Sequence, residues 1–390
     1  MKLLFVHDHP FYKDSNKIIY TGGSFPKQIW SNYLSNFNTI CVYSRKSKSI
    51  SSKNGISSRA NVTFYLTHHY STPIGIIKNK KRIEEELEVL IKDVDVVLTR
   101  LPSALGIIAG FLALKLNKRL WVEQVGNAHE ALNNHGTLKG KVIGPIIHFF
   151  NKKLIEKADF VSYVTESKLQ IDYPTNNEAI TVSLSNVIIN EIINEKDLDK
   201  ERFYGKMFKI GLIGGFDVRY KGQDILLRAI SLLPTDIKKN IKMNFVGKGN
   251  YSWIYAVAQN LGLKENIEFL GSLEAGHEIN AFLNTLSLYV QPSLTEGMPR
   301  ATIEAMAMGC PVIGSNVGGI PDIVTKRFLH KKGNVQQLSE HIKYLYLYRK
   351  ELEQESALSI QKSIPYLKAN LDKKRADFFE KMNKKLGHEN

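Results

Sequence analysis

Two glutamates, Glu296 and Glu304, lie eight positions apart in the stretch SLTEGMPRATIEAMAMGCPVIGSNVGGIPDIV, residues 293–324. A Gly-Met-Pro turn follows Glu296, an apolar helical run surrounds Glu304, and a short strand and a Gly-Gly turn come next. Loop, helix, strand and glycine turn in so few residues predict a βαβ-type crossover with polar groups at its mouth. Glu296 is expected to precede the helix and Glu304 to lie inside it, so the two carboxylates would reach different parts of one long ligand.

The same alternation of apolar strands, helices and glycine turns runs through the whole chain, which predicts an α/β fold of doubly wound parallel sheets. The length of 390 residues and the apolar content of 43% allow two domains with sizeable cores. A segment rich in Asn and Ile, residues 187–206, is the expected linker. We expect one domain over residues 1–200 and a second over residues 207–365. A polar loop over residues 8–20 and a helix over residues 26–37 are expected near the start of the first domain.

Residues 293–324 resemble the Glu-x7-Glu signature of family-4 retaining glycosyltransferases, together with the flanking patterns Pro-Ser-x-x-Glu-Gly-x-Pro, Glu-Ala-x-Ala-x-Gly-x-Pro-Val and Gly-Gly-x-Pro-Asp. The resemblance implies the GT-B fold, in which two Rossmann-like domains face each other across a cleft. It also implies that a C-terminal helix, here within residues 368–390, crosses back to complete the first domain. In that family the first glutamate lies by the donor sugar and the second accepts from the nucleotide ribose. The alternative is an amphipathic helix with two solvated glutamates.

The loop over residues 214–222 lies between an expected strand and an expected helix. Backbone amides at a helix start, together with an ammonium group, suit a diphosphate. Lys221-Gly222 match a Lys-Gly pair that faces the donor diphosphate in the family. The family's usual arginine position holds Phe216, so Arg219 is the candidate substitute. A dinucleotide-binding loop would need Gly-x-Gly-x-x-Gly, and the glycines here have the wrong spacing, which argues against a NAD-dependent oxidoreductase.

Further donor contacts follow from the resemblance, although each of these loops could also be a plain turn. A glycine turn after the first strand would approach the donor phosphates, and later turns would border the base, ribose and sugar. The expected donor-binding residues are Gly22, Gly23, Gly215, Lys221, Gly247, Gly249, Glu296, Gly297, Met298, Pro299 and Glu304.

The loop that follows residues 119–125 departs from the family pattern. Many members have a histidine where this strand ends, but here the position falls on Gly126 or Asn127. Asn127, His129, Glu130 and His135 are candidates for the group under the reacting sugar carbon, and a surface or structural role stays open for each. The catalytic candidates are Glu296, Lys221, Arg219, Asn127 and His129.

The implied reaction needs no protein nucleophile and no metal. Lys221, Arg219 and helix-start amides would stabilise the departing diphosphate, and front-face attack by an acceptor hydroxyl would retain the anomeric configuration. Asp93-Val-Asp95 lies at a strand entrance and is expected to be structural, and no Cys/His cluster has zinc spacing. We expect no bound cofactor, with a UDP- or GDP-linked sugar as donor substrate.

The net charge of +15 bears on the partners of this chain. Residues 1–60 hold nine Lys/Arg against two Asp/Glu, which suits an anionic bilayer surface, an anionic substrate or nucleic acid. No nucleic-acid recognition motif supports the last reading.

No segment reaches the ~20 apolar residues of a membrane span, and the N-terminus has no signal-peptide layout. We expect a cytoplasmic enzyme, peripheral at the inner membrane face, that extends a glycan or lipid-linked glycan during capsule, exopolysaccharide or lipopolysaccharide synthesis. A nucleotide-sugar epimerase or a basic nucleic-acid-binding protein is the alternative.

Overall fold

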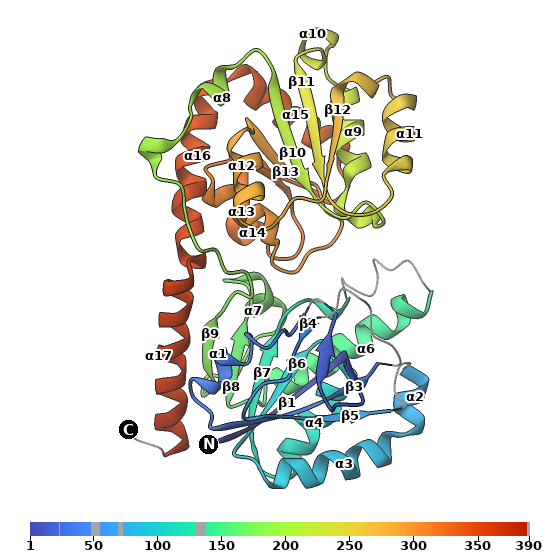
Figure 1. The fold of residues 1–390 in the computed structure, drawn as a ribbon, viewed down its shortest axis with the longest axis vertical. Helices are drawn as coiled ribbons and strands as arrows, with labels where there is room; N and C mark the ends of the chain where they lie inside the picture. The colour runs from blue at the N-terminus through green and yellow to red at the C-terminus, as the bar shows by residue number, and fades with distance from the viewer. Residues whose placement is uncertain (23, 48–54, 69–72, 130–137, 388–390) are drawn as a thin grey trace. The chain divides into compact units, whose positions relative to one another are not determined.

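The computed structural model describes residues 1–22, 24–47, 55–68, 73–129 and 138–387. Its contacts divide the chain into two compact units (Figure 1). The first unit comprises residues 1–164, 169–184 and 375–390, and the second comprises residues 165–168 and 185–374. Each unit is built on a sheet of parallel strands with helices on both faces, as the alternating pattern predicted, and the first sheet also carries two short antiparallel strands.

The first unit holds a nine-stranded sheet within the described residues. Its parallel strands lie in the order β5-β3-β1-β6-β7-β8-β9, and β2 and β4 extend β1 as antiparallel strands. The order reverses between β1 and β6, which are hydrogen-bonded neighbours. The bounds are β1 Lys2–Lys13, β2 Ile19–Thr21, β3 Thr39–Lys46, β4 Gly55–Ile56, β5 Val62–Thr67, β6 Val96–Leu101, β7 Arg119–Gln124, β8 Phe160–Tyr163 and β9 Ile180–Ser183.

Alternate residues of these strands enter two cores, one on each face of the sheet. Leu4 and Val6 of β1 face a core shared with α3, α4 and α6, whereas Leu3 and Phe5 face a core shared with α1 and α17. The side chain of Ser103 accepts a hydrogen bond from the amide of Gly106 and so caps α4. The helices are α1 Ser31–Leu34, α2 Pro73–Lys78, α3 Lys80–Lys92, α4 Ala104–Lys115, α6 Leu138–Ile155, α7 Lys168–Asp172 and α17 Lys368–Leu386.

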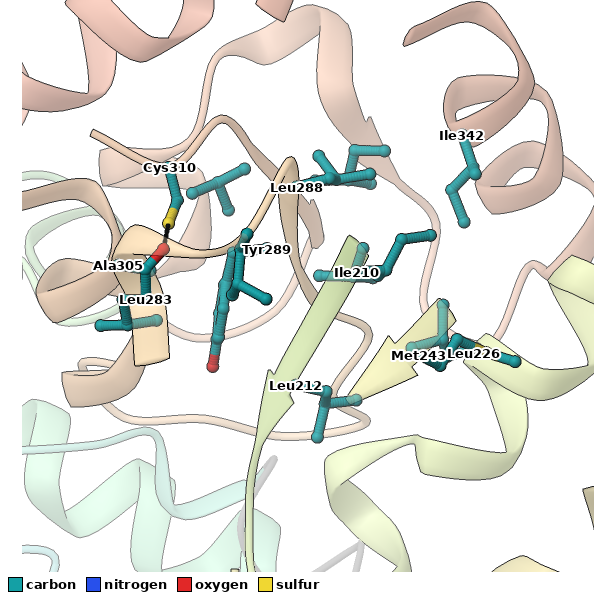
Figure 2. Close-up of a cluster of buried hydrophobic side chains, with 14 of the residues drawn as sticks. Ile210, Leu212, Leu226, Met243, Leu283, Leu288, Tyr289, Ala305, Cys310 and Ile342 are labelled. Carbon is teal, nitrogen blue, oxygen red and sulfur yellow. Dashed lines mark hydrogen bonds between the residues drawn. The ribbon is translucent and has the colours of Figure 1, made fainter. Parts of the chain in front are cut away.

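The second unit holds a six-stranded parallel sheet, counted over the same described residues, in the order β12-β11-β10-β13-β14-β15. Leucine, isoleucine and methionine side chains from its strands meet those of the covering helices (Figure 2). The strands are β10 Phe208–Ile213, β11 Ile241–Val246, β12 Ile267–Gly271, β13 Leu288–Gln291, β14 Val312–Ser315 and β15 Leu329–His330. The helices are α8 Glu201–Tyr204, α9 Gln223–Ser231, α10 Thr235–Lys238, α11 Ser252–Asn260, α12 His277–Asn284, α13 Arg300–Ala307, α14 Ile320–Ile323, α15 Val335–Leu347 and α16 Arg349–Ser363.

The structure differs from the sequence-based prediction near the N-terminus. β1 continues to Lys13 instead of ending in a polar loop, because buried Phe11 pairs with Thr21 of β2. The helix expected over residues 26–37 shortens to α1. The amide of Lys27 donates to the carbonyl of Ile56, so the start of this segment joins β4 and not a helix.

The segment expected as a linker, residues 187–206, belongs to the second unit, whose boundary lies at residue 185. Val187 and Phe203 are buried in its core. The guanidinium of Arg202 is buried as well and donates to the carbonyls of Asn284 and Met308. The buried residues of this segment follow no helix or strand period. The sequence-based prediction therefore rested on composition, which resembles that of a linker.

The C-terminal helix α17 ends within the first unit, as expected from the resemblance. Phe378, Phe379 and Met382 are buried in the core that holds Trp121. The rings of Trp121 and Phe378 lie 5.4 Å apart, and Phe379 meets Trp121 edge-on. Across the described helices, none is long and apolar enough to cross a membrane.

Candidate functional site

Lys221 lies where β10 gives way to α9. A single 3-10 turn, Arg219–Lys221, is followed by Gly222 and then by the first residue of the helix. Gly222 has φ +78°, and a Cβ at this position would lie 2.3 Å from the carbonyl oxygen of Pro292. Only glycine suits both the left-handed backbone and this close approach. The turn therefore brings Lys221 against the loop that follows β13.

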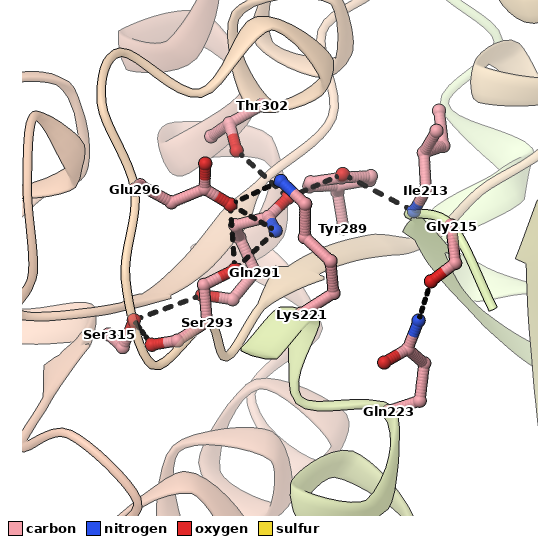
Figure 3. A network of polar contacts seen from close by, with 10 residues as sticks. All are labelled: Ile213, Gly215, Lys221, Gln223, Tyr289, Gln291, Ser293, Glu296, Thr302 and Ser315. Carbon is pink, nitrogen blue, oxygen red and sulfur yellow. Dashed lines mark hydrogen bonds and ion pairs between the residues drawn. The ribbon is translucent and has the colours of Figure 1, made fainter. Parts of the chain in front are cut away.

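Glu296 lies on that loop, before α13, as predicted. Its Oε1 atom accepts from Lys221 Nζ at 2.6 Å, from Ser293 Oγ at 2.8 Å and from Gln291 Nε2 at 3.2 Å (Figure 3). The Lys221 and Glu296 side chains are 22% and 8% exposed. β10 and β13 are neighbours at the point where the strand order reverses. The pair thus lies beyond the carboxyl ends of two strands at a topological switch point, where open α/β sheets bind ligands.

Gln291, at the end of β13, holds Glu296 in place from beneath. This side chain is buried, and its amide nitrogen donates to Glu296 and to Ser293 Oγ. Its amide oxygen accepts from Tyr289 Oη at 2.7 Å and from Thr302 Oγ1 at 3.3 Å. Burial raises the pKa of Tyr289 well above its ordinary value, so the phenol stays protonated and donates. Gln291 was not among the predicted residues.

The Gly318-Gly319 turn supports the same loop from the other side. The amide of Gly319 donates to the carbonyl of Gly297 at 2.7 Å. A Cβ on Gly318, which has φ +53°, would lie 2.1 Å from the carbonyl oxygen of Glu296. Ser315 Oγ donates to the carbonyl of Ser293 at 2.6 Å. The residues around the Gly-Gly turn therefore hold the backbone of the loop that carries Glu296.

Glu304 lies inside α13, as predicted, and is half-buried. Burial raises the pKa of this carboxyl, and the charge of Arg300 opposes the shift. Within the described residues no side chain forms an ion pair with it. Met298 and Pro299 are buried where α13 begins, with Pro299 in the N-cap position. Glu304 and Glu296 are thus split between helix and loop, as the sequence indicated.

The other predicted groups of the second unit surround the α9 turn. The guanidinium of Arg219 lies 5.0 Å from the ring of Trp253, so the structure places it against an aromatic ring and not in the Glu296 network. The carbonyl of Gly215 accepts from Gln223 Nε2 at 3.1 Å. The turn that contains Gly247 and Gly249 packs on the same loop, because the amide of Phe216 donates to the carbonyl of Lys248.

The first unit holds the remaining predicted residues. Asn127 Nδ2 donates to Asp172 Oδ2 at 2.8 Å, and Asn127 Oδ1 accepts from the amide of His129 at 3.0 Å. These bonds shape the loop around Asn127 and leave the His129 side chain exposed. Gly22 is exposed after β2. Gly23, Glu130 and His135 lie outside the described residues.

Carboxylates with a metal-like spacing have structural partners. Asp95 Oδ2 accepts from the amide of Lys2 at 2.7 Å, and Asp93 pairs with the Lys2 ammonium at 3.1 Å. In the described ranges, no group of three or more His, Cys, Asp or Glu residues is arranged to hold a metal ion. Asp93 and Asp95 therefore bind Lys2 at the start of β1, which is the structural role expected for them.

Two parallel-sheet, Rossmann-like units with a lysine-glutamate pair at a switch point define a protein of the GT-B class. The sequence profile of the family described as Glycosyl transferases group 1 matches residues 194–358. Protein CapJ of Staphylococcus aureus is 36% identical over 93% of this chain and 91% of its own length. The chain belongs to this glycosyltransferase family, as the resemblance implied.

Two further similarities agree with this assignment. The capsular polysaccharide biosynthesis glycosyltransferase CapH of Staphylococcus aureus is 27% identical over 64% of this chain and 64% of its own length. The solved structure of Anabaena HepE in complex with UDP and glucose has a TM-score of 0.61 at 14% identity and covers 99% of both chains. At that identity the structure supports the fold alone.

Proposed function

We propose that this glycosyltransferase moves a sugar from a nucleoside-diphosphate donor, UDP- or GDP-linked, to a hydroxyl of a glycan or lipid-linked glycan, with retention of the anomeric configuration. The similarity to CapH, a capsular polysaccharide biosynthesis glycosyltransferase, supports an acceptor in cell-surface polysaccharide synthesis, and the UDP in the HepE structure supports a nucleotide-sugar donor. The observation that carries the proposal is the Lys221–Glu296 pair at the switch point of the second unit.

Lys221 supplies the charge that the departing diphosphate needs. Lys221 lies two positions before the first residue of α9, and the backbone amides and helix dipole at that helix start also favour an anion. When the bond between sugar and diphosphate breaks, negative charge develops on the leaving oxygen, and fixed positive groups stabilise it. We therefore propose that transfer proceeds without a metal ion. Undiminished activity in EDTA supports this point, and activity that returns only with added Mg²⁺ or Mn²⁺ contradicts it.

Glu296 and Glu304 would contact the other two parts of the donor, the sugar and the ribose. Glu296, fixed by Gln291 and Ser293, is proposed to face the donor sugar, and half-buried Glu304 is proposed to accept from the ribose hydroxyls. The acceptor is assigned to the first unit, where Asn127 and His129 are the candidates near the reacting carbon. In this scheme the leaving oxygen of the diphosphate takes the proton of the acceptor hydroxyl, and no protein nucleophile is required.

The test is a screen of UDP- and GDP-sugars with glycan acceptors, followed by NMR of the new glycosidic bond. The proposal expects the donor's anomeric configuration in the product. An inverted product contradicts the retaining mechanism. Release of an epimerised sugar without any acceptor would instead favour the epimerase alternative.

A further inference from the structure

Helix α6 exposes apolar side chains that most surface helices bury. Ile146 is 50% exposed, Phe149 55% and Phe150 39%. Residues three and four positions apart share one face of a helix, so these three and Lys153 form a continuous strip, which we call the α6 surface. The opposite side of the helix is buried, with Asn151 and Ile155 fully shielded from solvent. The helix is therefore anchored while its aromatic strip faces solvent.

The charge of α6 is of one sign. Its sequence, LKGKVIGPIIHFFNKKLI, contains four lysines and no Asp or Glu. Lys153 Nζ lies 6.0 Å from the centre of the Phe149 ring, so a cation borders the apolar strip. Glu156, just beyond the helix, pairs with Lys153 at 2.9 Å and offsets one of these charges. The remaining lysines leave the helix basic.

Internal packing fixes part of the strip. The Phe150 ring meets Phe111 of α4 edge-on at 5.9 Å and lies 5.6 Å from Phe149. Phe149 thus packs on a ring that is itself held against α4. Exposed aromatic and aliphatic side chains bordered by lysines are the pattern of a helix that lies in the interface of an anionic bilayer, where rings enter the headgroup boundary and ammonium groups meet lipid phosphates.

We propose that the α6 surface docks this enzyme on an anionic lipid bilayer. The inference rests on the proposed function in one respect, since a lipid-linked acceptor would require contact with a membrane. Charge complementarity selects the occupant: a basic helix with exposed rings suits anionic headgroups better than a neutral bilayer.

The experiment measures partition of the full chain onto vesicles by flotation. One set contains phosphatidylglycerol and phosphatidylcholine, and the other contains phosphatidylcholine alone. The double variant Ile146→Ser/Phe149→Ser is compared with Ile171→Ser/Leu347→Ser, which removes apolar side chains that are 74% and 55% exposed elsewhere. We expect the wild type and the control to float with anionic vesicles, and the α6 variant to lose at least about tenfold in partition, or about 1.4 kcal/mol.

Three results would overturn the proposal. In the first, the wild type does not float with anionic vesicles. In the second, the α6 variant floats with them as well as the wild type does. In the third, sedimentation shows that the wild type self-associates and that the α6 variant is monomeric. The last result would assign the face to a second copy of the chain. Calorimetry with UDP and GDP in the absence of vesicles tests the donor site separately, so loss of membrane binding with intact nucleotide binding overturns only this inference.

Discussion

Lys221 Nζ lies 2.6 Å from Glu296 Oε1, although the two residues are 75 positions apart in the chain. They follow neighbouring strands, β10 and β13, and both side chains are largely shielded from water. In this ion pair each charge neutralises the other. A donor diphosphate must therefore compete with Glu296 for the ammonium, and removal of either partner leaves a poorly solvated charge.

Replacement of Lys221 by alanine should lower turnover by about 10²–10³-fold, because the departing diphosphate loses its fixed cation. Steady-state transfer rates with the identified donor measure the effect. Lys209→Ala is the matched control, since Lys209 is exposed on β10, the strand that precedes the Lys221 turn. Similar rates for both variants would contradict the role of Lys221.

Gln291→Met should reduce kcat/KM through Glu296. The substitution keeps the side-chain volume but removes the amide that donates to Glu296 Oε1 and accepts from Tyr289. If Gln291 acts by positioning Glu296, its substitution should have little further effect in a Glu296→Gln background. Additive losses in the double variant would show that Gln291 acts on something else.

The pKa of Glu304 predicts a pH-dependent gain in stability for Glu304→Gln. Burial raises the folded-state pKa above the ordinary value of 4.5, so ionisation of Glu304 destabilises the fold as pH rises through that range. The variant should unfold at a higher temperature than the wild type at pH 7, and the difference should vanish well below pH 4.5. A constant difference across pH would contradict the assigned shift. The same variant should bind nucleoside diphosphate more weakly.

Gly222→Ala separates steric contact from backbone strain. The left-handed conformation alone costs about 1–2 kcal/mol, and the new Cβ would also meet the Pro292 carbonyl oxygen at 2.3 Å. Gly262→Ala is the control, because Gly262 has φ +68° and no atom within 4 Å of the added Cβ. Gly222→Ala should lower the melting temperature more than the control and should also lower activity. Equal shifts would mean that the close approach to Pro292 is unimportant.

Local patterns predicted the parts of the site that depend on local structure. A Gly-Met-Pro turn before an apolar helical run placed Glu296 outside α13 and Glu304 inside it. The Lys221–Glu296 pair was not predicted, because it depends on the order of β10 and β13 in the sheet. Gln291 was missed for a different reason: an amide at the end of an apolar strand looks like any strand residue until its partners are known. Residues 187–206 looked like a linker because their buried side chains follow no helix or strand period.

Calorimetric titration of UDP and GDP into the wild type and Lys221→Ala tests the central claim most directly. The account predicts that one of these nucleoside diphosphates binds the wild type, and that Lys221→Ala weakens binding by at least about tenfold, or about 1.4 kcal/mol. Absence of binding by either nucleotide, or equal affinity in Lys221→Ala, would contradict the assignment of the Lys221–Glu296 site to the donor diphosphate.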